Sequence, residues 1–376
     1  MSTETNRPEP DRVEGAPHPR ETERLLGQEK AQGGFLEAFN SGRLHHGWLL
    51  TGPRGIGKST LAWTMAKFLI ATPSGSDGGL FGDAPQIAET LEISPDHPVS
   101  HRMMAGSEPA LFVLRRPYDE KSGKLKSQIT VDEVRRLKNF FALSAADGGR
   151  RVVIVDSADE MNVNAANALL KVLEEPPADA TLILISHQPS ALLPTIRSRC
   201  RELRLSPLGA QDMEQALAQA GVEISGDANA LAQLSGGSVG EAIRVASLGG
   251  MEMYGELVGL FSGLPKPDRQ RALKLAEAAA TRGAETRFDL LLDMIDLFLA
   301  RLARTGAIGA PPQTEAVPGE AELLSRLAPS QASAHLWADA AQLIGQRTRH
   351  GQAVNLDPAA LVLDTVFRIQ KTAAQT

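Results

Sequence analysis

The feature that most constrains this chain is a glycine-rich turn between a short apolar run and a helical segment. The turn fits the phosphate-binding pattern G-x-x-x-x-G-K-[ST] at every fixed position, and reads Gly52-Pro53-Arg54-Gly55-Ile56-Gly57-Lys58-Ser59. The apolar run, 47–51, is typical of a strand, and residues 58–66 have the spacing of a helix. We therefore expect a strand, a phosphate-binding loop and a helix in this order.

The residues of this loop have separate expected roles. Glycines allow backbone N–H groups to turn toward phosphate oxygens, and the N-terminus of the following helix adds a favourable dipole. We expect Lys58 to meet the β- and γ-phosphates, Ser59 to offer its hydroxyl to Mg²⁺, and Thr60 to line the same site. The loop thus predicts binding of ATP or ADP with Mg²⁺. The alternative is a loop that keeps its shape without binding a nucleotide.

Two further strand ends are expected at this site. The β-branched run 151–155 is followed by Asp156, as in a central parallel strand that ends in an acid. In nucleotide-binding proteins with this loop, such an acid helps to hold Mg²⁺, so Ser59 and Asp156 are the predicted metal ligands. The next apolar run, 181–186, ends in Ser186, which we also assign to the nucleotide site.

The order of the segments predicts an α/β domain followed by helices. Strand and helix patterns alternate over 21–207, which favours a parallel sheet covered on both faces. Residues 1–20 contain four prolines and no apolar periodicity, and are expected to be a disordered leader. The stretch 73–126 has the composition of an irregular insertion, with one strand at 111–114. Beyond residue 207 the periodic segments are helical, and one apolar stripe comprises Phe288, Leu291, Leu292, Ile295, Leu299 and Leu302.

Composition excludes several classes of protein. The single cysteine, Cys200, rules out an internal disulfide and a zinc site built on several thiolates, and it fits a cytoplasmic protein. No apolar run approaches the length of a membrane span, and no apolar stretch of a secretory signal opens the chain. The net charge of −6 argues against a protein that binds DNA through bulk positive charge.

Three further motifs carry a resemblance to a family. These are the segment His45-His46-Gly47-Trp48-Leu49, the helix end Asn167-Ala168-Leu169-Leu170-Lys171-Val172-Leu173-Glu174-Glu175-Pro176-Pro177, and Arg197-Ser198-Arg199-Cys200. In this order they resemble the bacterial DNA polymerase III clamp-loader subunits. The resemblance implies an AAA+ domain over 21–207, a small helical lid domain over 208–250, and a helical collar over 251–376 through which five subunits form an open ring. The implied partners are the gamma/tau motor subunit, the delta subunit, the sliding clamp and primed DNA.

The same resemblance gives Arg199 a role in trans. In the family, the arginine of the Ser-Arg-Cys motif reaches the ATP site of a neighbouring subunit. A guanidinium suits this task because it stays charged and offers a rigid fork of donors to the γ-phosphate. Without the family context, an arginine in this charged segment is more often a solvated surface residue.

The chain differs from the motor subunits of this family at two positions, and at both it resembles the delta-prime type. Motor subunits have a glutamate directly after the acid that Asp156 matches, whereas this chain has Ser157. Motor subunits also have a lid arginine in a Gly-Ser-x-Arg pattern, and here Gly240 stands in its place. A subunit that binds a nucleotide but hydrolyses it poorly is therefore expected. The alternatives are an ATP-hydrolysing gamma/tau-type motor subunit and a P-loop kinase or other NTPase outside DNA replication.

Two clusters in the chain have weaker implications. His97 and His101 lie in the insertion, and two lone histidines do not predict a zinc site. Positive charge is concentrated between 115 and 138, and a solvated face and a DNA or subunit contact both remain open. The residues concerned are Arg115, Arg116, Lys121, Lys124, Lys126, Arg135, Arg136 and Lys138.

Overall fold

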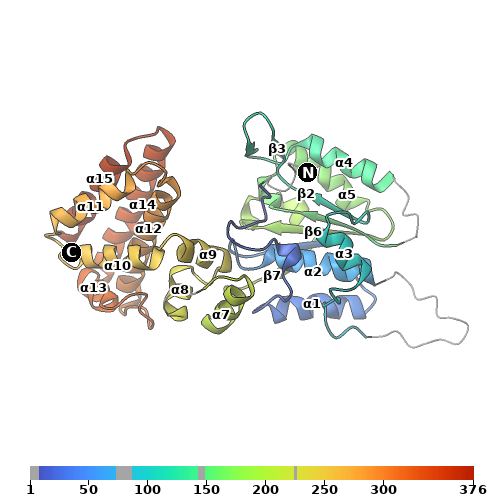
Figure 1. The fold of residues 1–376 in the computed structure, drawn as a ribbon, viewed down its shortest axis with the longest axis horizontal. Coiled ribbons are helices and arrows are strands. Elements are labelled where there is room, and N and C mark those ends of the chain that lie inside the picture. The colour runs from blue at the N-terminus through green and yellow to red at the C-terminus, as the bar shows by residue number, and fades with distance from the viewer. Residues whose placement is uncertain (1–7, 73–86, 143–148, 224–226) are drawn as a thin grey trace, which may run out of the picture. The chain divides into compact units, whose positions relative to one another are not determined.

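The computed structural model describes residues 8–72, 87–142, 149–223 and 227–376. The chain divides into two compact units (Figure 1). The first unit comprises Met1–Val222 with Ser238–Gly240, and the second comprises Glu223–Gly237 with Glu241–Thr376. Among the described residues, no helix combines the length and apolar character needed to cross a bilayer.

A five-stranded parallel sheet forms the centre of the first unit. In spatial order its strands are β2 (Leu111–Leu114), β5 (Arg151–Val155), β6 (Ala180–Ser186), β1 (Gly47–Thr51) and β7 (Arg201–Arg204). Each neighbouring pair of these strands is parallel. The strands β1 and β6 are buried along their whole length, as expected for strands covered on both faces. The carboxyl ends of all five strands therefore lie at one edge of the sheet.

Helices cover both faces of this sheet (Figure 1). On one face lie α1 (Glu29–Asn40) and α2 (Lys58–Ala71), where the Phe35 ring packs edge-on against Trp48 of β1. On the other face α4 (Val131–Ala142), α5 (Val163–Glu174) and the short α6 (Pro194–Arg197) enclose an apolar core with the alternate strand residues. This three-layer arrangement confirms the predicted α/β class.

The remaining short elements of the first unit lie around this core. They are η2 (Pro19–Glu21), α3 (Pro98–Met104), the hairpin of β3 (Tyr118–Asp119) and β4 (Lys124–Leu125), η3 (Ala158–Glu160), η4 (Pro189–Ala191) and α7 (Ala210–Gln219). Within the expected insertion, β2 was predicted, whereas α3 and the hairpin were not; residues 73–86 lie outside the described residues. His97 caps α3 by accepting a hydrogen bond from the Val99 N–H.

The second unit is helical, as predicted for the chain beyond the sheet. Its helices are α8 (Ala228–Leu234), α9 (Val239–Ser247), α10 (Gly250–Phe261), α11 (Arg269–Ala279), α12 (Glu285–Ile308), α13 (Glu320–Leu327), α14 (Gln331–Ala353) and α15 (Pro358–Ala373). The predicted apolar stripe lies on α12, and all six of its residues are buried. Its main packing partner is α14.

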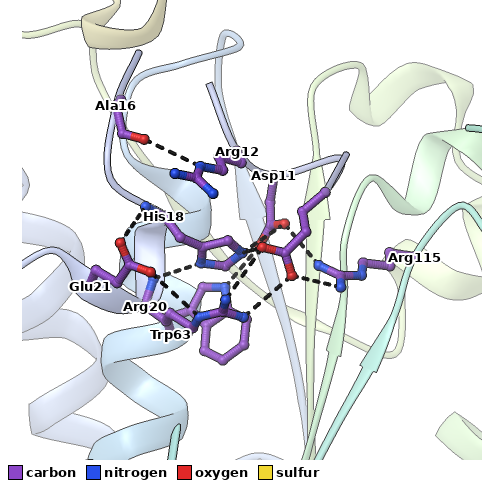
Figure 2. Close-up of polar contacts among 9 residues, drawn as sticks. Asp11, Arg12, Ala16, His18, Arg20, Glu21, Trp63 and Arg115 are labelled. Carbon is purple, nitrogen blue, oxygen red and sulfur yellow. Dashed lines mark hydrogen bonds and ion pairs between the residues drawn. The ribbon is translucent and has the colours of Figure 1, made fainter. Parts of the chain in front are cut away.

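The expectation of a disordered leader is wrong for residues 8–20, which pack against α2 and α3. We call residues 8–21 the N-terminal segment. Its contacts are polar: the Asp11 carboxylate, 1% exposed, accepts hydrogen bonds from Trp63 Nε1 (3.0 Å), His18 Nε2 (3.2 Å) and Arg115 Nη1 (3.2 Å) (Figure 2). His18 itself is fully buried. Because these contacts are polar and join distant residues, apolar periodicity gave no sign of them.

Candidate nucleotide-binding site

The loop between β1 and α2 has the backbone that a phosphate-binding turn requires. Gly52, Gly55 and Gly57 have φ angles of 138°, 75° and 98°, a region in which side chains are strained. A Cβ at Gly52 would lie 2.8 Å from the Leu205 carbonyl oxygen, so a side chain is also excluded by packing. Ile56, in the middle of the loop, is fully buried and anchors it. The three glycines and the buried side chain of Ile56 therefore fix the shape of the loop.

Lys58 lies at the start of α2 and is only 3% exposed. Its Nζ donates hydrogen bonds to the carbonyls of Gly52 (2.7 Å) and Pro53. Burial lowers the pKa of Lys58 to about 8, although the carboxylate of Asp159 acts in the opposite direction. Neutral carbonyls do not balance the charge of a buried ammonium, whereas phosphate oxygens would. Ser59 and Thr60 follow, half-buried, in the first turn of the same helix.

Two buried oxygen atoms without partners lie at the carboxyl edge of the sheet. Asp156 directly follows β5, and Ser186 ends the adjacent β6; they are 3% and 0% exposed. Within the described part of the chain, Asp156 Oδ2 and Ser186 Oγ have no hydrogen-bond partner. Burial raises the pKa of Asp156 to about 7, and the carboxylate of Asp11 adds to this effect. Unpartnered buried oxygens beside a phosphate-binding loop fit Mg²⁺ and its nucleotide.

The residue after this acid, Ser157, has a left-handed backbone with φ 59°. Its Oγ lies 3.1 Å from His187 Nε2. Asp159 accepts a hydrogen bond from the His187 backbone N–H over 3.1 Å, and Glu160 forms an ion pair with Arg54 of the loop at 3.2 Å. Both acids are thus engaged, and neither takes the position next to Asp156.

His187 is a site residue that the sequence analysis missed. Burial lowers its pKa to about 4, with smaller contributions from the cations Lys58 and Arg54, so the imidazole is neutral at pH 7. Its Nδ1 atom is buried and has no hydrogen-bond partner among the described residues. The available signal was its position directly after Ser186, at the carboxyl end of a predicted strand.

Gly240 lies against the phosphate-binding loop within the first unit. Its N–H donates a hydrogen bond to the Gly55 carbonyl over 3.1 Å. A Cβ at Gly240 would lie 3.2 Å from Gly55 Cα and 3.3 Å from Val13 Cγ2, which is tight packing. A glycine at this position therefore brings the backbone itself onto the loop.

Arg199 lies at the opposite edge of the sheet. It precedes β7, and a Cβ at Gly47, the first residue of β1, would lie only 3.0 Å from the Arg199 carbonyl oxygen. The five residues of β1 separate this amino edge from the phosphate-binding loop by roughly 13 Å, at about 3.3 Å per residue. The side chain of Arg199 is 38% exposed, and its guanidinium contacts Glu174 at the end of α5.

Cys200 lies beside Arg199 and is not a reactive thiol. Burial raises its pKa to about 12, so the thiolate form is scarce at neutral pH. A Cβ at Gly47 would lie 3.3 Å from its Sγ atom. Cys200 is therefore a small packed residue.

The basic stretch separates into two groups. Four of its arginines form ion pairs with carboxylates: Arg115 with Glu9 and Asp11, Arg116 with Glu160, Arg135 with Asp132, and Arg136 with Glu133. The four lysines, Lys121, Lys124, Lys126 and Lys138, are exposed. A DNA or subunit contact by these lysines remains a prediction.

The part of the chain that contains these residues matches a known protein family. A family model described as "DNA polymerase III, delta subunit" matches residues 27–209, which contain the loop, Asp156 and Arg199. The chain is 39% identical over 253 residues to the "DNA polymerase III subunit delta'" of Pseudomonas aeruginosa, and the match covers 66% of this chain and 70% of that protein. The chain belongs to the DNA polymerase III delta-prime family.

The chain is also similar to two further DNA polymerase III subunits, one of the delta-prime type and one tau subunit. The delta-prime subunit of Escherichia coli is 33% identical over 213 residues, or 56% of this chain and 57% of that protein. The "DNA polymerase III subunit tau" of Salmonella typhimurium is 27% identical over 308 residues, or 74% of this chain and 43% of that protein. The match to this tau subunit covers less than half of that protein.

The structure brings most of the predicted site residues together. Those of the loop and the two strand ends lie at the carboxyl edge: Gly52, Pro53, Arg54, Gly55, Ile56, Gly57, Lys58, Ser59, Thr60, Asp156 and Ser186. Arg199 lies at the amino edge. The binding of a nucleotide and the action of Arg199 in trans both remain predictions.

Proposed function

We propose that this chain is a delta-prime subunit of a bacterial clamp loader, which binds a nucleotide, hydrolyses it poorly and supplies Arg199 to a neighbouring motor subunit. The proposed complex contains gamma/tau and delta subunits and loads the sliding clamp onto primed DNA in the cytoplasm. The observation that carries the proposal is the separation of two features: a complete phosphate-binding loop at one edge of the sheet and an exposed arginine at the other.

The residues at the carboxyl edge support nucleotide binding. Lys58 has a charge that only neutral carbonyls contact, and Asp156 and Ser186 offer buried oxygens that lack partners within the described residues. Ser59 and Asp156 would hold Mg²⁺, which when bound neutralises charge on the β- and γ-phosphates. Backbone N–H groups of the loop would orient the phosphates.

The same edge is poorly suited to hydrolysis. The attacking water in motor subunits is polarised by a glutamate, and here the corresponding Ser157 hydroxyl contacts a neutral imidazole instead. The lid arginine is also absent, and Gly240 offers only a backbone N–H that the Gly55 carbonyl already accepts. Without these two groups, the attacking water is poorly polarised and the negative charge on the γ-phosphate is poorly stabilised.

An ATPase measurement tests the proposal. The purified chain should assemble with gamma/tau and delta subunits, support clamp loading, and show negligible turnover by itself with or without primed DNA. The second candidate, a gamma/tau-type motor, is favoured by the similarity to a tau subunit. Steady hydrolysis by the isolated chain that disappears in Lys58→Ala would establish that candidate instead.

A further inference from the structure

Arg199 does not extend freely from the surface, because a glutamate holds it. Its Nη2 atom lies 2.9 Å from Glu174 Oε1, and its Nη1 donates to the Thr195 carbonyl oxygen over 3.1 Å. Glu174 is the last residue of α5, within the Leu-Glu-Glu-Pro-Pro stretch. The side chains of Arg199 and Glu174 are 38% and 43% exposed. The guanidinium is thus oriented by two acceptors while part of it stays open to solvent.

The backbone that carries Glu174 is fixed relative to the backbone of Arg199. His46 Nε2 donates to the Leu173 carbonyl oxygen over 2.9 Å at the end of α5. A Cβ at Gly47 would lie 3.2 Å from Leu173 Cδ2 and 3.0 Å from the Arg199 carbonyl oxygen, so both segments approach the start of β1 closely. The prolines after Glu175 prevent the helix from continuing. The ion pair therefore joins two rigid segments rather than two mobile loops.

We infer that Glu174 is a positioning residue for Arg199, which it holds in the orientation that the neighbouring subunit's nucleotide requires. The inference rests on the proposed role of Arg199 in trans and deepens it. An arginine loses considerable rotamer freedom when it is ordered, and a side chain that is already oriented avoids part of this loss when the transition state forms. Nη2 faces Glu174, and Nη1 faces the Thr195 carbonyl oxygen and, over 3.4 Å, the Ser198 hydroxyl. Nε has no hydrogen-bond partner among the described residues and can donate to a phosphate.

Fold stability is a poor explanation for this ion pair. Exposed pairs of this kind contribute little to the free energy of unfolding, because water screens the charges and two long side chains lose freedom. We therefore expect loss of this ion pair to have a larger effect on ATP turnover than on the stability of the fold. Glu175 gives a matched control, because it is the adjacent exposed acid, and no ion pair joins it to Arg199 within the described residues.

The test is ATP turnover by the reconstituted loader with clamp and primed DNA, in which only this chain is varied. We expect Glu174→Ala to lower kcat about two- to tenfold at the site that Arg199 serves, the factor expected when one long side chain must be ordered anew. The KM for ATP should stay unchanged, because the arginine acts on the transition state. Glu174→Gln, which keeps an acceptor oxygen, should retain more turnover than Glu174→Ala, and Glu175→Ala should match wild type.

A double-mutant cycle separates positioning from a general structural effect. If Glu174 acts through Arg199, then Glu174→Ala should cause no further loss in an Arg199→Ala chain. An equal loss in that background would overturn the inference. Increased turnover in Glu174→Ala would also overturn it, because the ion pair would then hold Arg199 back from the neighbouring nucleotide. If Arg199→Ala lowers turnover and Glu174→Ala does not, the inference is wrong while the proposed function stands. Unchanged turnover in an assembled Arg199→Ala complex would reject both.

Discussion

Asp11 Oδ1 lies 3.2 Å from Nη1 of Arg115, a residue 104 positions later in the chain. Glu9 Oε1 lies 2.9 Å from Nη2 of the same guanidinium. Arg115 directly follows β2, and Asp156 directly follows the neighbouring strand β5. The ion pairs therefore bring the N-terminal segment to the strand end beside the acid that we expect to hold Mg²⁺.

We expect Asp11→Ala to destabilise the first unit. The carboxylate is 1% exposed, and its loss leaves His18, Trp63 and Arg115 without their shared acceptor. The expected cost is about 3 kcal/mol, the lower end of the range for breaking a buried ion pair, because Arg115 is 31% exposed. Urea denaturation followed by tryptophan fluorescence measures it. The exposed pair of Arg135 and Asp132 supplies the control, since Asp132→Ala should change stability by less than about 1 kcal/mol.

The contribution of Asp11 should also depend on pH. Burial alone would raise the pKa of Asp11, but the hydrogen bond and charge of His18, with the charge of Arg115, lower it to about 2. A carboxyl whose pKa is lowered by folding stabilises the protein above its unfolded pKa near 3.8, and this stability is lost as the pH falls toward about 2. The difference in stability between wild type and Asp11→Asn should thus be present at pH 5 and shrink at about pH 3. A difference that stays the same at pH 3 would contradict this assignment.

The sequence predicted the positions of the loop and of the strand ends better than the N-terminal segment that lies against them. Glycines, a lysine and strand-terminal residues at the loop, Asp156 and Ser186 have local patterns, and parallel strands bring their ends to one edge. The contacts of Asp11 have no such pattern, because they join polar residues 52 and 104 positions apart. The ion pair between Glu174 and Arg199 also depends on tertiary placement. The tight backbone contact of Gly240 could be found only from coordinates.

We expect Lys58→Ala to abolish the binding of ATP or ADP with Mg²⁺. The variant removes the buried cation that faces the loop carbonyls, and with it the main charge available to the phosphates. Equilibrium titration with a fluorescent nucleotide measures the affinity. Lys67→Ala is the control, because Lys67 lies on the same helix and burial likewise lowers its pKa, yet it is outside the loop. Equally weak binding by wild type and Lys58→Ala would show that the loop has lost its function.

We expect Asp156→Asn to stabilise the nucleotide-free protein while it weakens Mg²⁺-dependent binding. Burial raises the pKa of Asp156 to about 7, from 3.8. A carboxyl whose pKa is raised on folding opposes folding as the pH rises from 3.8 through about 7, because its ionised form is buried. At pH 8 the gain in Asp156→Asn should be at most about 4 kcal/mol, since a pKa difference of one unit corresponds to about 1.4 kcal/mol.

Denaturation in EDTA at pH 8 and pH 5 measures this gain, which should be smaller at pH 5. Stability and ligand binding then change in opposite directions, as expected where a functional group is held in an unfavourable environment. A loss of stability in Asp156→Asn at pH 8 would mean that the carboxylate has a partner in the ligand-free protein. The Mg²⁺ assignment would then need another ligand.

The last prediction concerns catalysis that this chain supports in a neighbour. Arg199→Ala should leave the subunit folded and the loader assembled, because its exposed ion pair contributes little to stability. An arginine supplied in trans can be worth ~10³–10⁵ in turnover in other NTPases, but a ring with several ATP sites would lose only the share of one interface. A partial and clear fall in DNA-stimulated hydrolysis and clamp loading is therefore expected.

Arg199→Lys should rescue this loss poorly. A lysine keeps the charge, but its single ammonium cannot donate to Glu174, to the Thr195 carbonyl oxygen and to a phosphate in the planar geometry of a guanidinium. Gel filtration checks assembly, and ATPase with clamp and primed DNA measures the effect. Arg197→Ala is the control, because it removes a cation two residues away on α6. An equal fall in both variants would indicate a general effect of charge on DNA binding, since among the described residues Glu174 pairs with Arg199 and not with Arg197.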